Sequence, residues 1–142
     1  MLFSRRLLNL LTFRPATTLV TPPIDGLILP GVTRDSVLAI ARDHASGKRP
    51  VSGLPTNLVV EERNVTMAEV KSAVQKGELV ELFGTGTAAI ISPVDRIGYL
   101  GEDIHIPVGD DGMGPLSRPF WERLVGIQRG AIESDWNVVV CE

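Results

Sequence analysis

The chain has 142 residues, a formal net charge of −3, and 44% hydrophobic and 22% charged residues. These values are typical of one globular domain with a core of its own. Acidic and basic residues are interleaved, and no apolar run approaches the length of a membrane-spanning helix. We therefore expect no nucleic-acid partner and no membrane partner. The single cysteine, Cys141, excludes an internal disulfide framework and a cysteine-built zinc site.

The first 18 residues differ from the remainder in composition. They contain Arg5, Arg6 and Arg14, no acidic residue and repeated leucines. An arginine-rich, acid-poor, amphipathic N-terminus is typical of a mitochondrial presequence, but these leucines also suit a core strand or helix. We therefore treat 1–18 as an atypical N-terminus, a presequence or an altered start, and 19–142 as the folded domain. The expected location is mitochondrial or cytoplasmic.

The first predicted elements are a short apolar run at 27–29 and a helix that follows Pro30 and Gly31. Thr33 is the expected N-cap of this helix, and Asp35 lies in its first turn. One side of the helix carries the apolar residues Val37, Leu38, Ile40 and Ala41. This spacing predicts that the helix packs on a core.

The segment 45–57 is rich in Gly, Pro, Ser and Lys, which predicts an exposed loop. A strand is expected to begin at 58–60. Thr66 and Glu69 then form a capping box, a pattern that begins a helix. The buried stripe of this helix is formed by Val70, Ala73 and Val74. Gly77 occupies the position after the last turn, where glycine favours helix termination.

The second half of the chain is predicted to be mostly strands, at 79–83, 89–91, 96–99, 104–108 and 136–140. A helix is expected to start near Ser117 and to end at Gly130. Its buried face is formed by the apolar residues Phe120, Trp121, Leu124 and Ile127. Helices and strands mix without strict βαβ alternation, so the predicted fold class is α+β.

A run of small residues separates the strands predicted at 79–83 and 89–91. Small residues bury little surface, and they suit places where another molecule approaches the backbone. Gly84, Gly86 and Ala89 match the spacing of a dinucleotide-binding fingerprint, which requires a helix directly afterwards. A proline follows too soon for such a helix. The sequence therefore predicts a strand–turn–strand unit.

Two turns of the sequence could hold an anion. In the glycine turn, the hydroxyls of Thr85 and Thr87 accompany several backbone N–H groups. Taken alone, this stretch favours the alternative of a tight turn whose threonines satisfy their own backbone. Gly31 precedes a helix start and leaves the N–H groups of Val32 and Thr33 without intrahelical acceptors, where phosphate binds readily. Together the two turns suit a small phosphorylated cofactor beside a carboxylate.

Four segments, 19–42, 60–73, 81–107 and 114–130, carry long motifs such as LPGVTR and ELFGTGTAAIISP. In this order they resemble the C-terminal part of branched-chain amino-acid aminotransferases, which are pyridoxal-phosphate enzymes of the fold-type IV class. The resemblance runs from about Leu19 to the end. It implies the C-terminal portion of the large domain of a two-domain subunit that works as a homodimer. The implied reaction moves an amino group between leucine, isoleucine or valine and 2-oxoglutarate.

The resemblance also implies roles for individual residues. The cofactor-binding residues that it implies are Leu29, Gly31, Val32, Thr33, Gly86 and Thr87. Leu29 is expected to pack on the ring of pyridoxal 5′-phosphate (PLP). The N–H groups of Val32 and Thr33 and the side chain of Thr87 are expected to hold its phosphate. The N–H groups of Thr87 and Ala88 are expected to face the substrate carboxylate.

The lysine that carries the cofactor in this family lies upstream of the matched segments, and so do the small domain and the glutamate that partners the pyridine nitrogen. The lysines of this chain are Lys48, Lys71 and Lys76, and none has the sequence context of the family's lysine. No catalytic residue is therefore assigned. Two interpretations stay open. One is an aminotransferase chain that is inactive alone, and the other is a non-catalytic fragment that keeps phosphate-binding or dimer contacts.

Three further polar residues have ordinary interpretations. His105 is predicted at an exposed strand position and His44 at a helix end, and neither has partners at metal-ligand spacing. Arg34 follows the phosphate motif and could add positive potential there. A solvated first-turn arginine is the favoured interpretation, and no metal site is predicted.

Overall fold

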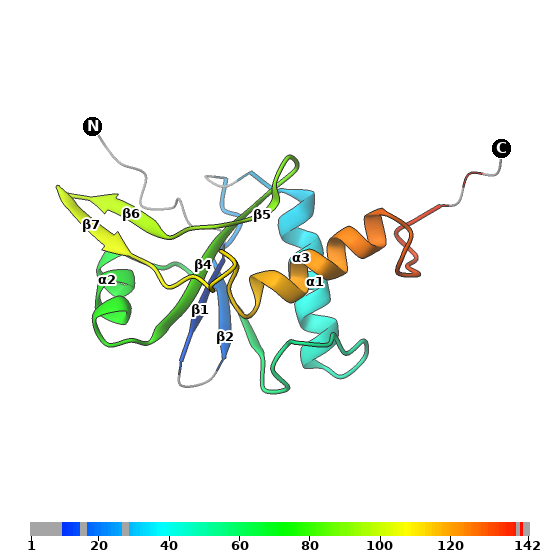
Figure 1. The fold of residues 1–142 in the computed structure, drawn as a ribbon, viewed down its shortest axis with the longest axis horizontal. Helices are drawn as coiled ribbons and strands as arrows, with labels where there is room; N and C mark the ends of the chain where they lie inside the picture. The colour runs from blue at the N-terminus through cyan, green and yellow to red at the C-terminus, as the bar shows by residue number, and fades with distance from the viewer. Residues whose placement is uncertain (1–9, 15–16, 27–28, 139, 141–142) are drawn as a thin grey trace.

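The computed structural model describes residues 10–14, 17–26, 29–138 and 140. Its centre is a five-stranded sheet with the strand order β3-β2-β1-β4-β5 (Figure 1). The strands of this sheet are β1 (Leu10–Phe13), β2 (Thr18–Thr21), β3 (Val59–Glu62), β4 (Leu79–Gly86) and β5 (Ile90–Pro93). A separate hairpin is formed by β6 (Arg96–Tyr99) and β7 (Glu102–His105). The predicted α+β class is confirmed.

Strand β1 lies at the centre of the sheet and pairs antiparallel with β2 and with β4. Leu11 pairs with Val20 of β2 on one side and with Leu82 of β4 on the other. β2 and β3 pair in parallel, whereas β4 and β5 form an antiparallel hairpin. Because side chains alternate along a strand, Leu10 and Leu11 point to opposite faces of the sheet, and they belong to different core clusters.

Three helices, α1 (Val32–Ala45), α2 (Met67–Gln75) and α3 (Ser117–Gln128), cover the sheet. α1 and α3 pack on one face, where the rings of Phe83 and Phe120 are fully buried with centroids 6.4 Å apart. α2 and the β6–β7 hairpin pack on the other face, around Val70, Leu82 and Ile104 (Figure 1). No helix in the described part of the chain is long and apolar enough to cross a membrane.

The starts of α1 and α2 depend on neighbouring residues in the sequence, and one of the two predictions needs correction. Thr66 caps α2 as predicted, because its Oγ1 accepts the backbone N–H of Glu69 at 3.2 Å. The N-cap of α1 is Gly31, so the prediction of Thr33 is wrong. Gly31 has extended backbone angles (φ −77°, ψ 130°), and its carbonyl accepts the N–H of Asp35 at 3.1 Å. The helix therefore begins before Thr33, which lies inside the first turn.

The segment expected to be an atypical N-terminus, 1–18, contains a central element of the fold. Its residues Leu10–Phe13 form β1, with Leu10 and Leu11 fully buried. The segment was interpreted either as a presequence or as a core strand or helix, and Leu10–Phe13 is a core strand. The residues 1–9 lie outside the described part of the chain, so a targeting role for them stays a prediction.

Three strands have bounds that differ from the predicted ones, and the first of these is β5, which covers Ile90–Pro93 instead of 89–91. β4 continues to Gly86 instead of ending at Phe83, since its last residues pair with β5. β7 covers Glu102–His105 instead of 104–108. The turn before it needs only Leu100 and Gly101, whose φ angles are 51° and 80°, and the second strand can begin at once.

The strand predicted at 136–140 does not form in its described residues. Asn137 donates its backbone N–H to the carbonyl of Ser134 at 3.1 Å, so this segment makes a turn instead of pairing with a strand. An ion pair between Asp135 and Arg49, at 2.9 Å, connects the turn to the loop after α1.

Candidate functional site

The start of α1 and the turn between β4 and β5 border one pocket. Its volume is about 250 Å³, and its lining residues are Leu29, Gly31, Val32, Thr33, Arg34, Thr85, Gly86 and Thr87. The two segments are the two turns that the sequence predicts as anion sites, so the fold brings them together. Ala88 does not line the pocket but lies in the same turn, next to Thr87. The predicted run at 27–29 is described only at Leu29.

The α1 end of the pocket is built from backbone groups. Gly31 caps the helix with no side-chain hydrogen bond, and its N–H donates to the carbonyl of Leu29 at 2.8 Å. The N–H groups of Val32 and Thr33 belong to the first helical turn, where no intrahelical acceptor exists. The partial positive charge of the helix end adds to these N–H groups. This end of the pocket therefore suits an anion.

The other end of the pocket is the turn at 87–89, between β4 and β5. Ile90, the residue after the turn, has a positive φ of 60°, and the N–H of Ile91 donates to the carbonyl of Ala89 at 2.6 Å. Positive φ disfavours a β-branched residue, and such strain concentrates at functional sites. A strand, β5, follows the turn. The exclusion of a dinucleotide-binding fingerprint is therefore confirmed.

The fold does not require a glycine at Gly86 or Gly31. Neither residue has a φ in the left-handed region. Among the described residues, a Cβ atom at Gly86 would meet no other atom within 4 Å, and one at Gly31 would meet only the carbonyl oxygen of Leu29 at 4.0 Å. Because internal packing explains neither glycine, the space beside both is available to a ligand that approaches the backbone.

Arg34 lines the pocket, and its environment contradicts the prediction of a solvated side chain. The side chain is 4% exposed, and its Nη2 donates to the Pro22 carbonyl at 2.8 Å and to the Glu62 carboxylate at 2.9 Å. Arg42 pairs with the second oxygen of Glu62. Hydrogen bonds from Arg34 and then from Arg42 lower the pKa of Glu62. Removing a charged group from water costs free energy, so buried charges in proteins are normally paired. The ion pair with Glu62 satisfies this condition for Arg34.

None of the three lysines lines the pocket. Lys71 lies on α2 and pairs with Glu102 of β7, on the opposite face of the sheet from α1. Lys48 has a 68% exposed side chain and pairs with Asp43 at 3.6 Å in the turn after α1. Lys76 is the C-cap residue of α2. The fold therefore places no lysine amine beside the pocket.

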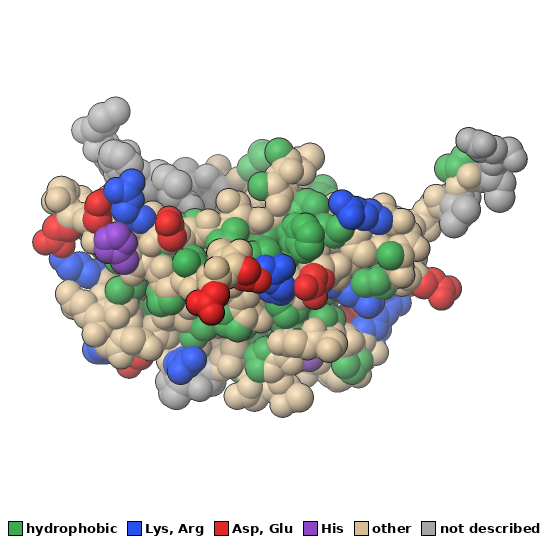
Figure 2. All heavy atoms as spheres, in the orientation of Figure 1, with side chains coloured by type: hydrophobic (Ala, Val, Ile, Leu, Met, Phe, Trp, Pro, Cys, Tyr) green, Lys and Arg blue, Asp and Glu red, His purple; other side chains and the backbone are tan. Residues whose placement is uncertain are grey.

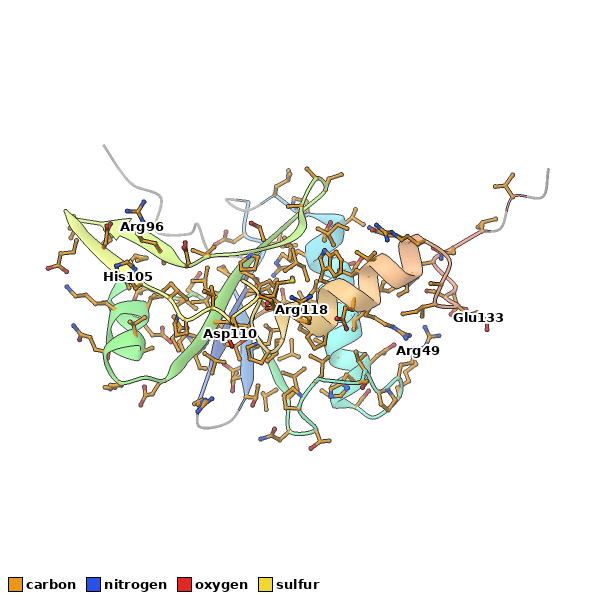
Figure 3. The ribbon with its side chains drawn as sticks, in the orientation of Figure 1. Arg49, Arg96, His105, Asp110, Arg118 and Glu133 are labelled. Atoms are coloured by element: carbon orange, nitrogen blue, oxygen red, sulfur yellow. The ribbon has the colours of Figure 1, made fainter. Side chains whose placement is uncertain are left out.

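Neither histidine lines the pocket. His105 is exposed on β7, at the end of the molecule far from α1 (Figure 3). His44 is buried in the last turn of α1, where its Nδ1 accepts the N–H of Val51 at 2.9 Å. Its Nε2 therefore carries the proton and donates to the carbonyl of Pro55 at 3.0 Å. Among the residues that the structure describes, no group of three or more His, Cys, Asp or Glu is placed to hold a metal ion.

Sequence reasoning missed the role of Glu81. This residue of β4 is 2% exposed, and its carboxylate accepts the N–H groups of Leu116 at 2.6 Å and Ser117 at 3.2 Å. Burial raises the pKa of Glu81, and the hydrogen bonds oppose this shift in part. The signal in the sequence is one acidic residue inside an otherwise apolar strand. Its contacts hold the start of α3 and do not reach the pocket.

The fold of the described residues is that of part of a fold-type IV aminotransferase. The branched-chain amino acid aminotransferase from Escherichia coli matches with a TM-score of 0.58 at 27% identity, over 92% of this chain and 36% of that chain. The branched-chain amino acid aminotransferase from Thermobaculum terrenum, solved in its PLP form, matches with a TM-score of 0.57 at 25% identity. That match covers 88% of this chain and 33% of the other.

In sequence, the chain is similar to branched-chain-amino-acid aminotransferases of eukaryotes. The relative from Monosiga brevicollis is 40% identical over 122 residues, which are 86% of this chain and 28% of the relative. The cytosolic relative from Saccharomyces cerevisiae is 42% identical over 126 residues, 87% of this chain and 31% of the relative. No protein-family model matches. The resemblance stated from the motifs is confirmed, and the chain spans 28–31% of the length of these relatives.

Proposed function

We propose that residues 19–142, together with β1, form the part of a branched-chain amino-acid aminotransferase that binds the phosphate of the cofactor. The whole protein then transfers an amino group between leucine, isoleucine or valine and 2-oxoglutarate. One observation carries the proposal. Two backbone anion sites, Gly31–Thr33 and Gly86–Thr87, converge on a single pocket of about 250 Å³.

The pocket fits the phosphate group of PLP. The N–H groups of Val32 and Thr33 and the hydroxyl of Thr87 are proposed donors, and each hydrogen bond to a charged acceptor contributes about 1.5–3 kcal/mol. The helix end adds about 0.3–1 kcal/mol. The open space beside Gly31 and Gly86 leaves room for phosphate oxygens at the backbone. When bound, PLP supplies an electron-accepting ring, and these residues supply its position.

Two further residues of the same segments have separate proposed roles. Leu29 is 85% exposed at the edge of the pocket, so its side chain is available to pack on an apolar ring. Burial of a leucine side chain contributes about 1.5–3 kcal/mol. The N–H groups of Thr87 and Ala88 lie in one turn, and we propose that they orient the carboxylate of the amino-acid substrate.

The proposed partners are small molecules and a second copy of the whole protein in a homodimer. The face shown in Figure 2 carries interspersed acidic and basic side chains, with no broad patch of one sign. This face therefore offers no basic patch for nucleic acid. The relatives from Saccharomyces cerevisiae are cytosolic and mitochondrial, and we propose one of these two locations for this protein.

Residues 1–142 in isolation are proposed to bind PLP without transaminating. The placement of the lysines supports this second candidate, because none of them lines the pocket. Lys48 and Lys71 pair with acidic residues elsewhere, and Lys76 is the C-cap residue of α2. A lysine that acts on the cofactor must lie beside it and be able to lose its charge. The chain would then keep phosphate binding, dimer contacts or both.

The test uses the purified chain, PLP and borohydride reduction, followed by mass-spectrometric mapping of any labelled lysine. We expect saturable PLP binding, no stoichiometric lysine label, and no turnover of leucine with 2-oxoglutarate. One stoichiometric label together with turnover would overturn the proposed inactivity. Absence of binding to both PLP and inorganic phosphate would overturn the proposed site.

A further inference from the structure

The side chain of Arg34 connects the first turn of α1 to the ends of two strands. Its Nε donates to Thr21 Oγ1 at 3.2 Å, and its Nη2 donates to the Pro22 carbonyl at 2.8 Å and to Glu62 at 2.9 Å. Thr21 and Glu62 are the last residues of β2 and β3, and they are register partners in the parallel pair. The guanidinium group therefore spans the carboxyl ends of two neighbouring strands.

The first turn of α1 has few other attachments. Gly31 has no side-chain cap, Val32 is 82% exposed, and Asp35 is exposed as well. Arg34 is the buried side chain within this turn, at 4% exposure. A helix end with little burial frays unless a specific contact holds it. The contacts of Arg34 therefore hold the backbone that presents the N–H groups of Val32 and Thr33.

The geometry of arginine suits this task. Its planar, rigid fork of donors fixes several acceptors at once, which the single ammonium of lysine does not do. Glu62 is shared by Arg34 and by the half-exposed Arg42, which approaches from the next turns of the same helix. One carboxylate between two guanidinium groups leaves this cluster with a net positive charge beside the pocket.

We propose that Arg34 is a positioning residue for phosphate, which holds the N–H groups of Val32 and Thr33 in place from behind without contacting the ligand. This inference rests on the proposed function of the pocket. It predicts that changes at Arg34 weaken the binding of a phosphate ester specifically. It also predicts that they loosen the first turn of α1 when no ligand is present.

The test compares Arg34→Met and Arg34→Lys with Arg42→Met, which removes the exposed arginine from the same Glu62. Affinities for pyridoxal phosphate and for pyridoxal, which lacks the phosphate, are measured by titration. Hydrogen exchange of the Asp35 amide, which donates to the Gly31 carbonyl, reports opening of the first turn. We expect both Arg34 variants to weaken pyridoxal phosphate binding about tenfold or more and to speed exchange of the Asp35 amide by a similar factor. Their affinity for pyridoxal should change less than about twofold. In Arg42→Met, the affinities and the exchange rate should also change less than about twofold.

Three results would overturn the role of Arg34. Unchanged exchange and affinity in Arg34→Met, full retention in Arg34→Lys, or an equal loss in Arg42→Met would overturn the inference. If Arg34→Met does not fold, Thr21→Val and Glu62→Gln remove one partner of Arg34 each, and the same measurements apply. If the unmodified chain binds no phosphate compound, the proposed function fails, while exchange at Asp35 still decides the role of Arg34.

Discussion

The carboxylate of Glu81, on β4, accepts the backbone N–H of Leu116 at the start of α3, at a distance of 2.6 Å. Leu116 is the N-cap position of α3 and makes no side-chain cap hydrogen bond. A carboxylate from the sheet thus replaces the local cap, as acidic groups favour helix N-termini. A Cβ atom at Gly114 would collide with this carboxylate. The start of α3 therefore depends on one buried acid and on one glycine.

The stability of the chain should depend on pH through Glu81. Burial raises the pKa of this carboxyl above its ordinary value of 4.5, so the folded state binds the proton more tightly than the unfolded state. The contribution of Glu81 to stability is therefore complete below pH 4.5 and is lost as the pH rises toward the folded pKa. As the pH rises through this range, Glu81→Gln should become more stable relative to the unmodified chain, because glutamine does not ionise. Urea unfolding at several pH values measures the difference, and a constant difference would contradict the prediction.

Glu62 should produce the opposite dependence. Hydrogen bonds from Arg34 and Arg42 lower its pKa below 4.5, so its contribution is complete above that value and is lost as the pH falls toward the folded pKa. Glu62→Gln should destabilise the chain by about 1–2 kcal/mol at pH 7, a value discounted because Glu62 is one-third exposed. The difference from the unmodified chain should shrink below pH 4.5. Urea unfolding curves of both proteins at pH 3 to 7 measure this difference in the free energy of unfolding. A difference that stays constant or grows as the pH falls would contradict the prediction.

Gly86→Ala should separate binding from stability. The added methyl group meets no atom within 4 Å in the part of the chain that the structure describes. The free energy of unfolding should therefore change by less than about 0.5 kcal/mol, while inorganic phosphate and PLP bind more weakly. Gly98→Ala is the matched control, since it also lies in a strand and its Cβ has room, with the nearest atom at 3.8 Å. Equal phosphate affinity in both variants would remove Gly86 from the site.

Gly114→Ala should instead lower the free energy of unfolding by about 1–3 kcal/mol, because the added methyl group overpacks against Glu81.

Thr87→Val should weaken PLP binding by about tenfold to a hundredfold, because a hydroxyl donor to a charged acceptor contributes about 1.5–3 kcal/mol. The affinity for pyridoxal, without phosphate, should stay the same. Thr56→Val, in the exposed loop after α1, provides the control for the general effect of this substitution. A titration in which Thr87→Val and Thr56→Val bind PLP equally well would exclude the Thr87 hydroxyl from the phosphate site.

Local signals in the sequence predicted most helices and strands and both turns of the pocket. Thr66 and Gly77 mark the two ends of α2 because caps depend on a few neighbouring residues. A turn between the strands predicted at 79–83 and 89–91 was expected from its small residues, and the proline that closely follows excluded a helix there. In the structure this turn is shorter and covers 87–89. The spacing of residues did not show that this turn lies beside Gly31. That adjacency depends on the pairing of distant strands.

Four features were missed or wrongly predicted because they depend on tertiary contacts. Arg34 and Glu81 are charged residues that sequence reasoning assigns to solvent or leaves without a role, and each is buried by partners far along the chain. Leu10–Phe13 has a strand-like composition, but only its pairing on both sides makes it the centre of the sheet. The apolar residues near 136–140 predicted a strand, and no neighbouring strand edge is paired with the described part of this segment.

The central place of β1 has a consequence for the order of folding. Its partner β2 follows closely along the chain, whereas Leu11 meets its other partner, Leu82, only after a long intervening segment has been synthesised. The entropy of closing that large loop must be overcome before the pairing stabilises the chain. We therefore expect docking of β4 to limit the folding rate, and Leu82→Ala to slow refolding more than Val60→Ala on β3. Until β4 docks, β1 exposes a backbone edge to which other nascent chains can pair and begin aggregation.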